Sequence, residues 1–177
     1  MKSDKEYSPG EELFSKQQID RRVAAMGRKI ARDFEGEELV VLVVLKGAMY
    51  FATGLTQNMP RDIYLDFIQI SSYGREEKSS GVVRFLMRPR VEMKDKNVLI
   101  IEDIIDTGVS MNRVVPYIKR RGAKRVVTAA LLDKPAKRVV PFEADYVGFT
   151  IPPRFVVGSG LDSGERYRNV RGIRALD

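Results

Sequence analysis

The sequence predicts an α/β fold, in which helices flank a central parallel sheet. Three short runs of mainly apolar residues, at 39–45, 98–101 and 125–132, lack the alternation of half-exposed strands and are typical of strands covered on both faces. Segments with the apolar spacing of helices lie between these runs. A charged residue follows each run, and ligands bind beyond the carboxyl ends of the strands in open α/β sheets. The expected arrangement is therefore Rossmann-like.

The length of 177 residues predicts a single domain, 1–177, with a substantial core. Hydrophobic residues make up 44% of the chain and charged residues 31%, as in ordinary globular proteins. No apolar run is long enough to span a bilayer, and the polar N-terminus differs from a signal peptide. Together with the absence of cysteine, these features fit a cytoplasmic protein without a membrane partner.

The absence of histidine and cysteine excludes several kinds of chemistry. Histidine-based catalytic triads and metal sites, disulfides and thiol catalysis cannot be built from this chain. General acid–base catalysis is left to carboxylates, lysine or tyrosine. The formal charge of +7 predicts anionic partners, for which nucleic acid and a polyphosphate substrate are both candidates.

The first predicted element is a helix over 15–34, which follows a polar segment at 1–12. Ser15 is a suitable N-cap for this helix, and Gly36 a suitable stop. The helix carries an apolar stripe at Ile19, Val23, Met26, Ile30 and Phe34. Apolar surface left by this helix would be consistent with a dimer or tetramer.

A buried strand over 39–45 ends at Lys46 and Gly47, before a helical segment that reaches about residue 58. A lysine and a glycine at a strand end can bind an anion, although such pairs are common at turns between strands and helices. The glycine spacing of a Walker loop, and its Ser or Thr after lysine, are missing.

A polar stretch rich in small residues, 71–81, separates predicted strands at 63–70 and 82–87. Its length and composition are typical of a mobile loop. Such a loop serves as a lid in some domains and as a plain hairpin connection in others.

Two adjacent carboxylates, Glu102 and Asp103, follow the apolar run 98–101, where the strand is expected to end. They would suit a sugar diol or a hydrated metal ion. The alternative is that the next acid, Asp106, and Ser110 only cap the following helix. Capping accounts for one acid but not for three within five residues, so we favour a functional site.

A short polar loop then precedes a helix predicted over 109–121. Backbone amides at the start of a helix bind anions, and Gly108 lets the chain approach a ligand closely. The hydroxyls of Thr107 and Ser110 lie beside it in the sequence. The loop therefore predicts a cradle for a phosphate monoester.

Two further strands are predicted at 125–132 and 146–150. Lys134 follows the first of them, and we expect it at the same sheet edge as Lys46 and Glu102. The next basic residues, Lys137 and Arg138, are interpreted as a solvent-exposed turn.

The segment 151–162 combines prolines, glycines and a short apolar stretch, unlike a core element. We expect a small hood over the carboxyl edge of the sheet, formed by about 151–177 with about 1–14. The remaining core spans about 36–150. Taken alone, the pair Phe155 and Val156 is more typical of a core than of a platform for a base.

The stretch 98–110 resembles the phosphoribosyl-diphosphate (PRPP) signature of type I phosphoribosyltransferases. Two hydrophobic residues and two acids lead into a D-T-G-x-S/T loop, and the wording Glu-Asp-Ile-Ile-Asp-Thr-Gly is similar to the hypoxanthine-guanine branch. The resemblance covers roughly 39–168 and implies the type I phosphoribosyltransferase fold. It implies purine salvage, in which the 5-phosphoribosyl group of PRPP passes to hypoxanthine or guanine. It further implies Mg²⁺ as cofactor and a homodimer or homotetramer.

The resemblance also implies roles for single residues. Asp106 would act as the general base toward N7 of the purine, and Glu102 and Asp103 would orient the ribose hydroxyls or a metal. The 5′-phosphate would be held by the loop residues Asp106, Thr107, Gly108, Val109 and Ser110. The diphosphate would be bound by Lys46, Gly47 and Arg168. The remaining assignments are Lys134, Phe155 and Val156 to the purine, Asp162 to the metal, and Ser72 and Tyr73 to a closing lid.

The chain departs from the family pattern at a few positions near its end, namely Pro153, Arg154, Ser159 and Ser163. Two alternatives stay open. One is an RNA-binding, nucleotide-sensing regulator on the same fold, in which Lys134 and Phe155 would have no role. The other is a phosphoribosyltransferase for xanthine, adenine or a pyrimidine, and the match at Lys134 disfavours the last two.

Overall fold

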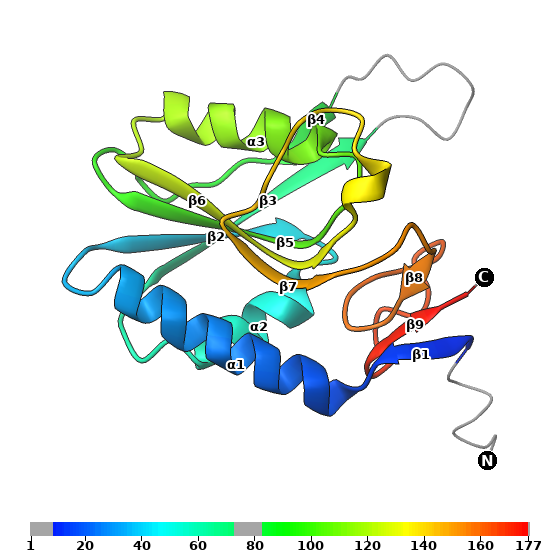
Figure 1. Cartoon of the computed structure of the whole chain (residues 1–177). Coiled ribbons are helices and arrows are strands. Elements are labelled where there is room, and N and C mark those ends of the chain that lie inside the picture. The colour runs from blue at the N-terminus through cyan, green and yellow to red at the C-terminus, as the bar shows by residue number, and fades with distance from the viewer. Residues whose placement is uncertain (1–8, 73–82, 177) are drawn as a thin grey trace.

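A computed structural model describes residues 9–72 and 83–176 and shows a six-stranded main sheet beside a smaller three-stranded one (Figure 1). The main sheet has the order β4-β3-β2-β5-β6-β7; β4 is antiparallel to β3, and the other neighbouring pairs are parallel. Its strands are β2 (Leu39–Leu45), β3 (Tyr64–Ser72), β4 (Val83–Met87), β5 (Asn97–Ile105), β6 (Arg125–Asp133) and β7 (Tyr146–Thr150). The predicted α/β fold with a central parallel sheet is confirmed.

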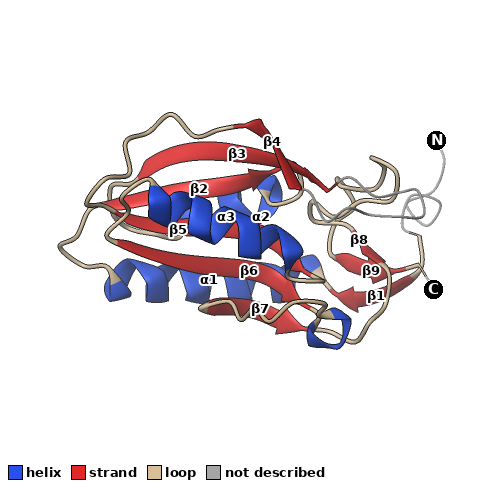
Figure 2. Ribbon diagram, turned by 90° about the horizontal axis from the view of Figure 1, so that it is seen from above, coloured by secondary structure: helices blue, strands red, loops and turns tan. Residues whose placement is uncertain are grey.

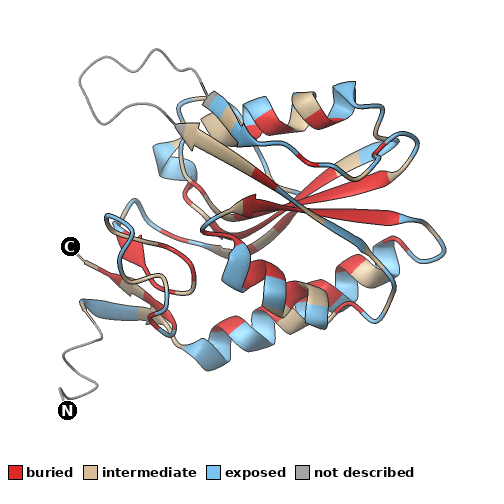
Figure 3. Ribbon diagram, turned by 180° about the vertical axis from the view of Figure 1, so that it is seen from behind, coloured by how far each residue is buried: buried red, intermediate tan, exposed pale blue. Residues whose placement is uncertain are grey.

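Helices cover both faces of the main sheet (Figures 1 and 2). Helices α1 (Lys16–Asp33) and α2 (Met49–Gln57) lie on one face, and α3 (Val109–Arg120) lies on the other. Along β2 the side chains alternate between the two layers: Val41 and Val43 pack with α1 and α2, whereas Val40 and Leu42 pack with α3. Figure 3 shows the resulting buried strands at the centre of the sheet. Burial on both faces explains why the strand sequences are apolar without alternation.

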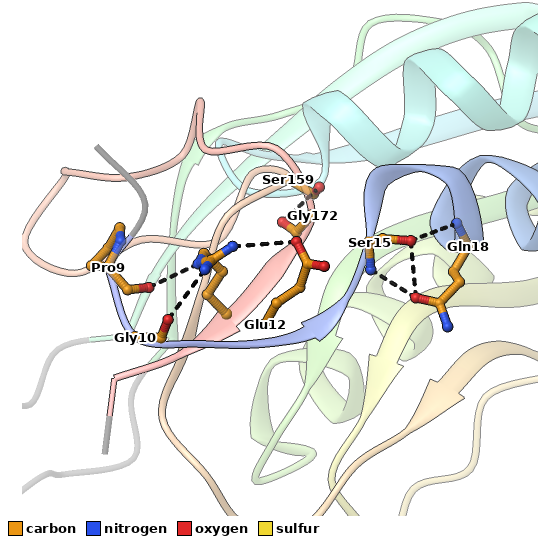
Figure 4. Close-up of polar contacts among 8 residues, drawn as sticks. Pro9, Gly10, Glu12, Ser15, Gln18, Ser159 and Gly172 are labelled. Carbon is orange, nitrogen blue, oxygen red and sulfur yellow. Dashed lines mark hydrogen bonds and ion pairs between the residues drawn. The ribbon is translucent and has the colours of Figure 1, made fainter. Parts of the chain in front are cut away.

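The first helix begins at a capping box. The Ser15 side chain accepts from the backbone of Gln18, and the Gln18 side chain accepts from the backbone N–H of Ser15 at 2.8 Å (Figure 4). The apolar stripe of α1 is buried against the core, so the prediction that this helix leaves apolar surface for self-association is wrong. Exposed apolar side chains gather instead on α2, β3 and β4, at Met49, Tyr50, Tyr64, Leu65, Phe67, Leu86 and Met87.

The central strand β5 is longer than predicted. Its pairing with β6 continues past the apolar run, with Glu102 opposite Ala130 and Ile105 opposite Asp133. Glu102 and Asp103 therefore lie within the last part of a strand and not in the loop after it. A strand fixes the backbone at both positions, so these carboxylates are held more firmly than loop residues would be.

The N- and C-terminal segments meet in the small sheet, which has the order β1-β9-β8. Its strands are β1 (Glu11–Phe14), β8 (Val156–Val157) and β9 (Ile173–Ala175). The Arg174 guanidinium joins the two segments by donating to the carbonyls of Pro9 and Gly10, and Ser159 donates to the carbonyl of Gly172 at 3.0 Å (Figure 4). The small sheet lies beside the main sheet (Figure 1).

A close backbone contact joins this C-terminal segment to the carboxyl end of β2. Gly160 has a φ of +107°, and a Cβ added to it would lie 2.0 Å from the carbonyl oxygen of Gly47. Only glycine allows both this backbone conformation and this approach. The segment after β7 is thereby fixed against the turn that follows β2.

Three hydrogen bonds tie α1 to the edge strand β7. Arg22 donates from Nε to the carbonyl of Gly148 at 2.8 Å and from Nη2 to that of Val147 at 2.7 Å. The Tyr146 hydroxyl donates to Oδ2 of Asp33 at 2.8 Å.

Among the described residues, no helix has the length and apolar character needed to cross a membrane.

Candidate active site

A cavity of about 420 Å³ opens at the carboxyl ends of β2 and β5. The chain proceeds from β2 to β3 on one side and later to β5 on the other, so the strand order reverses between β2 and β5. Ligands bind at such a switch point in open α/β sheets. Among the predicted site residues, the cavity is lined by Gly47, Glu102, Asp103, Asp106, Thr107, Gly108, Val109, Ser110 and Asp162.

The predicted phosphate loop leads directly into α3. Gly108 precedes the helix with a φ of +82°, and a Cβ added to it would lie 2.7 Å from the carbonyl oxygen of Val140. No side chain caps α3 at Gly108, so the alternative in which Asp106 and Ser110 serve only as helix caps is wrong. The amides of the first turn have no partner within a helix and carry partial positive charge. The loop is suited to an anion.

Glu102 and Asp103 form a buried acidic pair. Burial raises the pKa of Glu102 well above its usual value, and the neighbouring charge of Asp103 raises it further. Burial also raises the pKa of Asp103. A Cβ added to Gly47 would lie 1.8 Å from Oδ2 of Asp103, so the turn after β2 can approach this acid only because residue 47 is glycine. Hydroxyl donors or a cation would stabilise the charged forms of the pair.

The carboxylate of Asp106 contacts the side chain of Lys134, which follows the neighbouring strand β6. The Lys134 side chain is only 7% exposed, and its Nζ lies 3.4 Å from Oδ2 of Asp106. The other carboxylate oxygen, Oδ1, is buried and has no hydrogen-bond partner. A buried acceptor without a partner is costly, so a donor that reached Oδ1 would form a favourable hydrogen bond. The structure thus brings the predicted base and the predicted purine-binding lysine together.

The predicted diphosphate-binding cations, Lys46 and Arg168, share one carboxylate. Oε2 of Glu165 lies 3.2 Å from Nζ of Lys46 and 3.1 Å from Nη2 of Arg168. The hydrogen bonds from Arg168 and Lys46 lower the pKa of Glu165. Arg168 also contacts Oδ1 of Asp162 at 2.9 Å. The two cations therefore lie close enough to bind a single anion together. The Leu45–Lys46 peptide bond is cis.

The carboxylates lining the cavity have the chemistry of a magnesium site. Glu102, Asp103 and Asp162 all offer hard oxygen ligands. Within 9–72 and 83–176, no three acidic side chains gather closely enough to hold a metal ion by themselves. Proteins commonly hold Mg²⁺ through one or two carboxylates and complete its shell with water and substrate phosphates. The residues present fit a metal that binds together with a phosphorylated substrate.

Some predicted site residues do not line this cavity. Val156 is buried in β8, and Phe155 before it is half exposed; neither lines the cavity. Ser72 ends β3, while Tyr73 and most of the predicted lid lie outside the described residues. A larger cavity of about 700 Å³ between α1 and α2 contains none of the predicted site residues.

Arg138 was not predicted to take part in the site. It is not a solvent-exposed turn residue, because its side chain is only 15% exposed and donates to the carbonyls of Ile105 and Asp106. No hydropathy pattern marks such a contact, since the two partners are more than thirty positions apart in the sequence. The prediction for Lys137, an exposed basic residue, agrees with the structure.

Comparison with protein families finds a match between residues 9–164 and the phosphoribosyl transferase domain. The hypoxanthine-guanine phosphoribosyltransferase of Aquifex aeolicus is 38% identical over 166 residues, which cover 93% of each chain. The bifunctional protein TilS/HprT of Listeria innocua is 44% identical over 164 residues. That alignment covers 93% of this chain, which spans about a quarter (25%) of the length of the bifunctional relative.

A solved structure gives the same result. The crystal structure of a hypoxanthine phosphoribosyltransferase from Staphylococcus aureus superposes with a TM-score of 0.93 at 34% sequence identity. The superposition covers 100% of this chain and 96% of the other.

Proposed function

Since the chain belongs to the phosphoribosyl transferase domain family, we propose that it is a purine-salvage enzyme that makes IMP or GMP. In this reaction the 5-phosphoribosyl group of PRPP passes to N9 of hypoxanthine or guanine, and diphosphate leaves. The observation that carries the proposal is one cavity lined by a buried acid pair, an anion loop and Asp106, which Lys134 contacts. These are the groups that a ribose, a phosphate and a purine require.

The sugar phosphate binds across the end of β5. The loop from Asp106 to Ser110 holds the 5′-phosphate through its amides and hydroxyls, as the start of a helix favours. Glu102 and Asp103 accept hydrogen bonds from the 2′- and 3′-hydroxyls. These bonds fix the ring, so that the anomeric carbon faces the purine.

Lys46, the Gly47 amide and Arg168 stabilise the diphosphate as it departs. Charge accumulates on the diphosphate oxygens while the sugar becomes oxocarbenium-like, so preorganised cations lower the barrier. In this proposal Glu165 releases both cations when the diphosphate binds. Mg²⁺, held in part through Asp162, supplies further positive charge to the diphosphate and ribose oxygens when bound.

Asp106 takes the proton from N7 of the purine as N9 forms its bond to the anomeric carbon. The bond between that carbon and the diphosphate oxygen breaks in the same process, and the electron pair leaves with the diphosphate. The unpartnered Oδ1 of Asp106 supports this role, because it is an acceptor available to an incoming N–H group. Lys134, on the other carboxylate oxygen, donates to the 6-oxygen of the base.

The purine stacks on Phe155, and the backbone of Val156 reads the edge of the base. Phe155 is about half exposed and so has apolar surface on which a base can stack, which supports this role. Ser72 and Tyr73 belong to a lid that excludes water from the reacting atoms.

The protein acts as one domain, with a core over about 36–150 and a hood formed by about 1–14 and 151–177. It works in the cytoplasm as a homodimer or homotetramer. The exposed apolar side chains on α2, β3 and β4 support the association of copies of the chain. Leu65 and Phe67 from β3 and Met49 from α2 line a groove of about 440 Å³ in this surface.

The test is a transfer assay with the purified chain, PRPP and Mg²⁺. We expect formation of IMP from hypoxanthine and of GMP from guanine, and little product from adenine, uracil or orotate. Xanthine is included to rank the 6-oxopurines. Transfer to adenine or to a pyrimidine in preference to hypoxanthine would overturn the proposal, as would the absence of transfer to any base.

A further inference from the structure

The side chain of Arg138 binds backbone carbonyl groups at the start of the phosphate loop. Its Nη1 donates to the carbonyl oxygens of Ile105 at 2.8 Å and of Asp106 at 2.5 Å. Nε donates to the carbonyl of Phe142 at 3.0 Å, and Nη2 pairs with the carboxylate of Asp133. One guanidinium thus joins the end of β5, the end of β6 and the segment after it.

The backbone beside Arg138 continues this support. The carbonyl oxygen of Thr107 accepts from the N–H groups of Val139 at 3.0 Å and of Val140 at 3.2 Å. Gly108 rests on the same segment, because a Cβ added there would lie 3.4 Å from Cδ of Arg138 and closer still to Val140. Residues 105–108 therefore lie against the segment 138–142 along their whole length.

These contacts set the direction of the amides. In a trans peptide the C=O and the N–H of the next residue point in opposite directions. Since the carbonyls of residues 105, 106 and 107 point toward the segment 138–142, the N–H groups of Asp106, Thr107 and Gly108 point away from it. Three successive N–H groups presented on one side form the concave site that binds an anion.

We propose that Arg138 is a positioning residue, held by Asp133, that orients the amides of the phosphate loop and the backbone of Asp106. The proposal rests on the proposed function, in which this loop binds the 5′-phosphate. Arg138 does not touch the substrate. It acts by fixing the carbonyls of Ile105 and Asp106, whose peptides carry the N–H groups of Asp106 and Thr107.

The chemistry of the guanidinium suits this role. Its planar fork reaches carbonyls and a carboxylate in several directions at once, whereas an ammonium group at the end of a flexible chain does not. Arg138→Lys keeps the positive charge but loses the fork. A displacement of about 1 Å in a substrate-binding group lowers activity by up to ~10²-fold. We therefore expect Arg138→Lys to raise KM for PRPP and weaken IMP binding by about 10–100-fold.

The experiment measures three properties of the full chain in parallel. They are kcat and KM for PRPP and for hypoxanthine, the Kd for IMP by calorimetry, and the midpoint of thermal unfolding. Asp133→Asn is the second variant; it leaves Arg138 in place but removes the charge that holds it, so we expect a smaller change in the same direction. Lys137→Met is the matched control, because it removes an exposed positive charge from the residue next to Arg138.

A merely structural role would lower the fraction of folded enzyme. That loss reduces kcat and leaves KM for PRPP and the Kd for IMP unchanged. Wild-type values of these two constants in Arg138→Lys, or an equal change in Lys137→Met, would overturn the proposal. If Arg138→Lys does not fold, Asp133→Asn with wild-type constants has the same consequence.

The failure of the proposed function has a different signature. A wild-type chain that binds IMP but makes none from PRPP and hypoxanthine would overturn the proposed reaction. The IMP affinities of the variants would then still decide the role of Arg138. A wild-type chain that does not bind IMP at all would overturn both.

Discussion

Nζ of Lys134 and Oδ2 of Asp106 lie 3.4 Å apart, although the two residues follow different strands. Their strands β5 and β6 are neighbours, with Ile105 paired with Asp133, so the two side chains emerge side by side. The contact holds the carboxylate with one oxygen toward the lysine and the other free of protein partners. The contact thereby holds the proposed base and the proposed purine-binding lysine in a fixed relation.

Replacement of Asp106 by asparagine removes the proposed base while keeping the shape of the side chain. We expect kcat to fall by ~10²–10⁴-fold, the usual effect of losing one acid–base group, with KM for PRPP largely unchanged. Steady-state kinetics with hypoxanthine measure both. The matched control is Asp20→Asn on the exposed surface of α1, which should keep the wild-type rate. Wild-type turnover in Asp106→Asn would discard the assignment.

Replacement of Lys134 by glutamine tests recognition of the 6-oxygen. The change replaces a charged donor by a neutral one, and a hydrogen bond to a charged group contributes ~1.5–3 kcal/mol. We expect kcat/KM for hypoxanthine to fall by about 10–100-fold. Adenine lacks this oxygen, so the low rate measured with adenine should not fall in proportion. An equal loss with both bases would show that Lys134 does not select the 6-oxygen.

The proposed function predicts that Glu165 competes with diphosphate for Lys46 and Arg168. Its side chain is 64% exposed, so the ion pairs are screened by water and easily displaced. Glu165→Gln should therefore strengthen diphosphate binding by only about two- to fivefold. Calorimetry with Mg²⁺ and diphosphate measures the change. Glu35→Gln, which removes an exposed acid just after α1, is the control. Weaker binding in Glu165→Gln would mean that the carboxylate assists the anion site.

The contact of Asp33 with Tyr146 predicts a pH-dependent stability. Hydrogen bonds from Lys29 and from Tyr146 lower the pKa of Asp33. A carboxyl group with a lowered pKa stabilises the fold above its ordinary pKa of 3.8, and this contribution disappears as the pH falls through the lowered value. Asp33→Asn should therefore cost about 1 kcal/mol of unfolding free energy at neutral pH.

Denaturant unfolding from neutral pH to about pH 3 tests this expectation. The difference between Asp33→Asn and the wild type should shrink toward the acid end, because the protonated carboxyl group resembles the amide. Asp20→Asn again serves as the control, since its exposed pair with Lys16 adds little. A difference that stays constant with pH would refute the electrostatic origin.

The apolar surface on α2, β3 and β4 predicts the contact between copies. Leu65 is 48% exposed and lines the groove in this surface, and a charge there would be buried without a partner in an assembly. We expect Leu65→Arg to shift the molar mass in light scattering from oligomer to monomer. Val139→Arg places the same charge at a site that is 73% exposed outside this surface and should leave the mass unchanged. An unchanged molar mass in Leu65→Arg would show that this surface does not form the contact between copies.

The fold follows from the sequence wherever local pattern and burial agree. The apolar run predicts a strand at 39–45, and the structure gives the same limits, because every residue in it is apolar and all but Leu45 are buried. The end of β5 was predicted too early. Glu102 and Asp103 are charged, but the pairing with β6 continues through them, and hydropathy does not record pairing.

The site was predictable only in part for a similar reason. The loop 106–110 is contiguous, so its chemistry can be read directly from the chain. The contacts of Arg138 with carbonyls thirty-three and thirty-two positions earlier depend on how β6 lies against β5. Likewise, only the packing of α1 shows that its apolar stripe is buried in the core. The exposed apolar side chains therefore lie on other elements.

Arg22 has a consequence for the behaviour of the protein at high concentration. The outer strand of a sheet exposes carbonyl groups that can pair with a strand from another molecule, which is a route to aggregation. Because Arg22 already donates to the carbonyls of Val147 and Gly148, β7 offers fewer acceptors to an intruding strand. A residue without side-chain donors at position 22 would therefore leave these carbonyls open to pairing with another molecule.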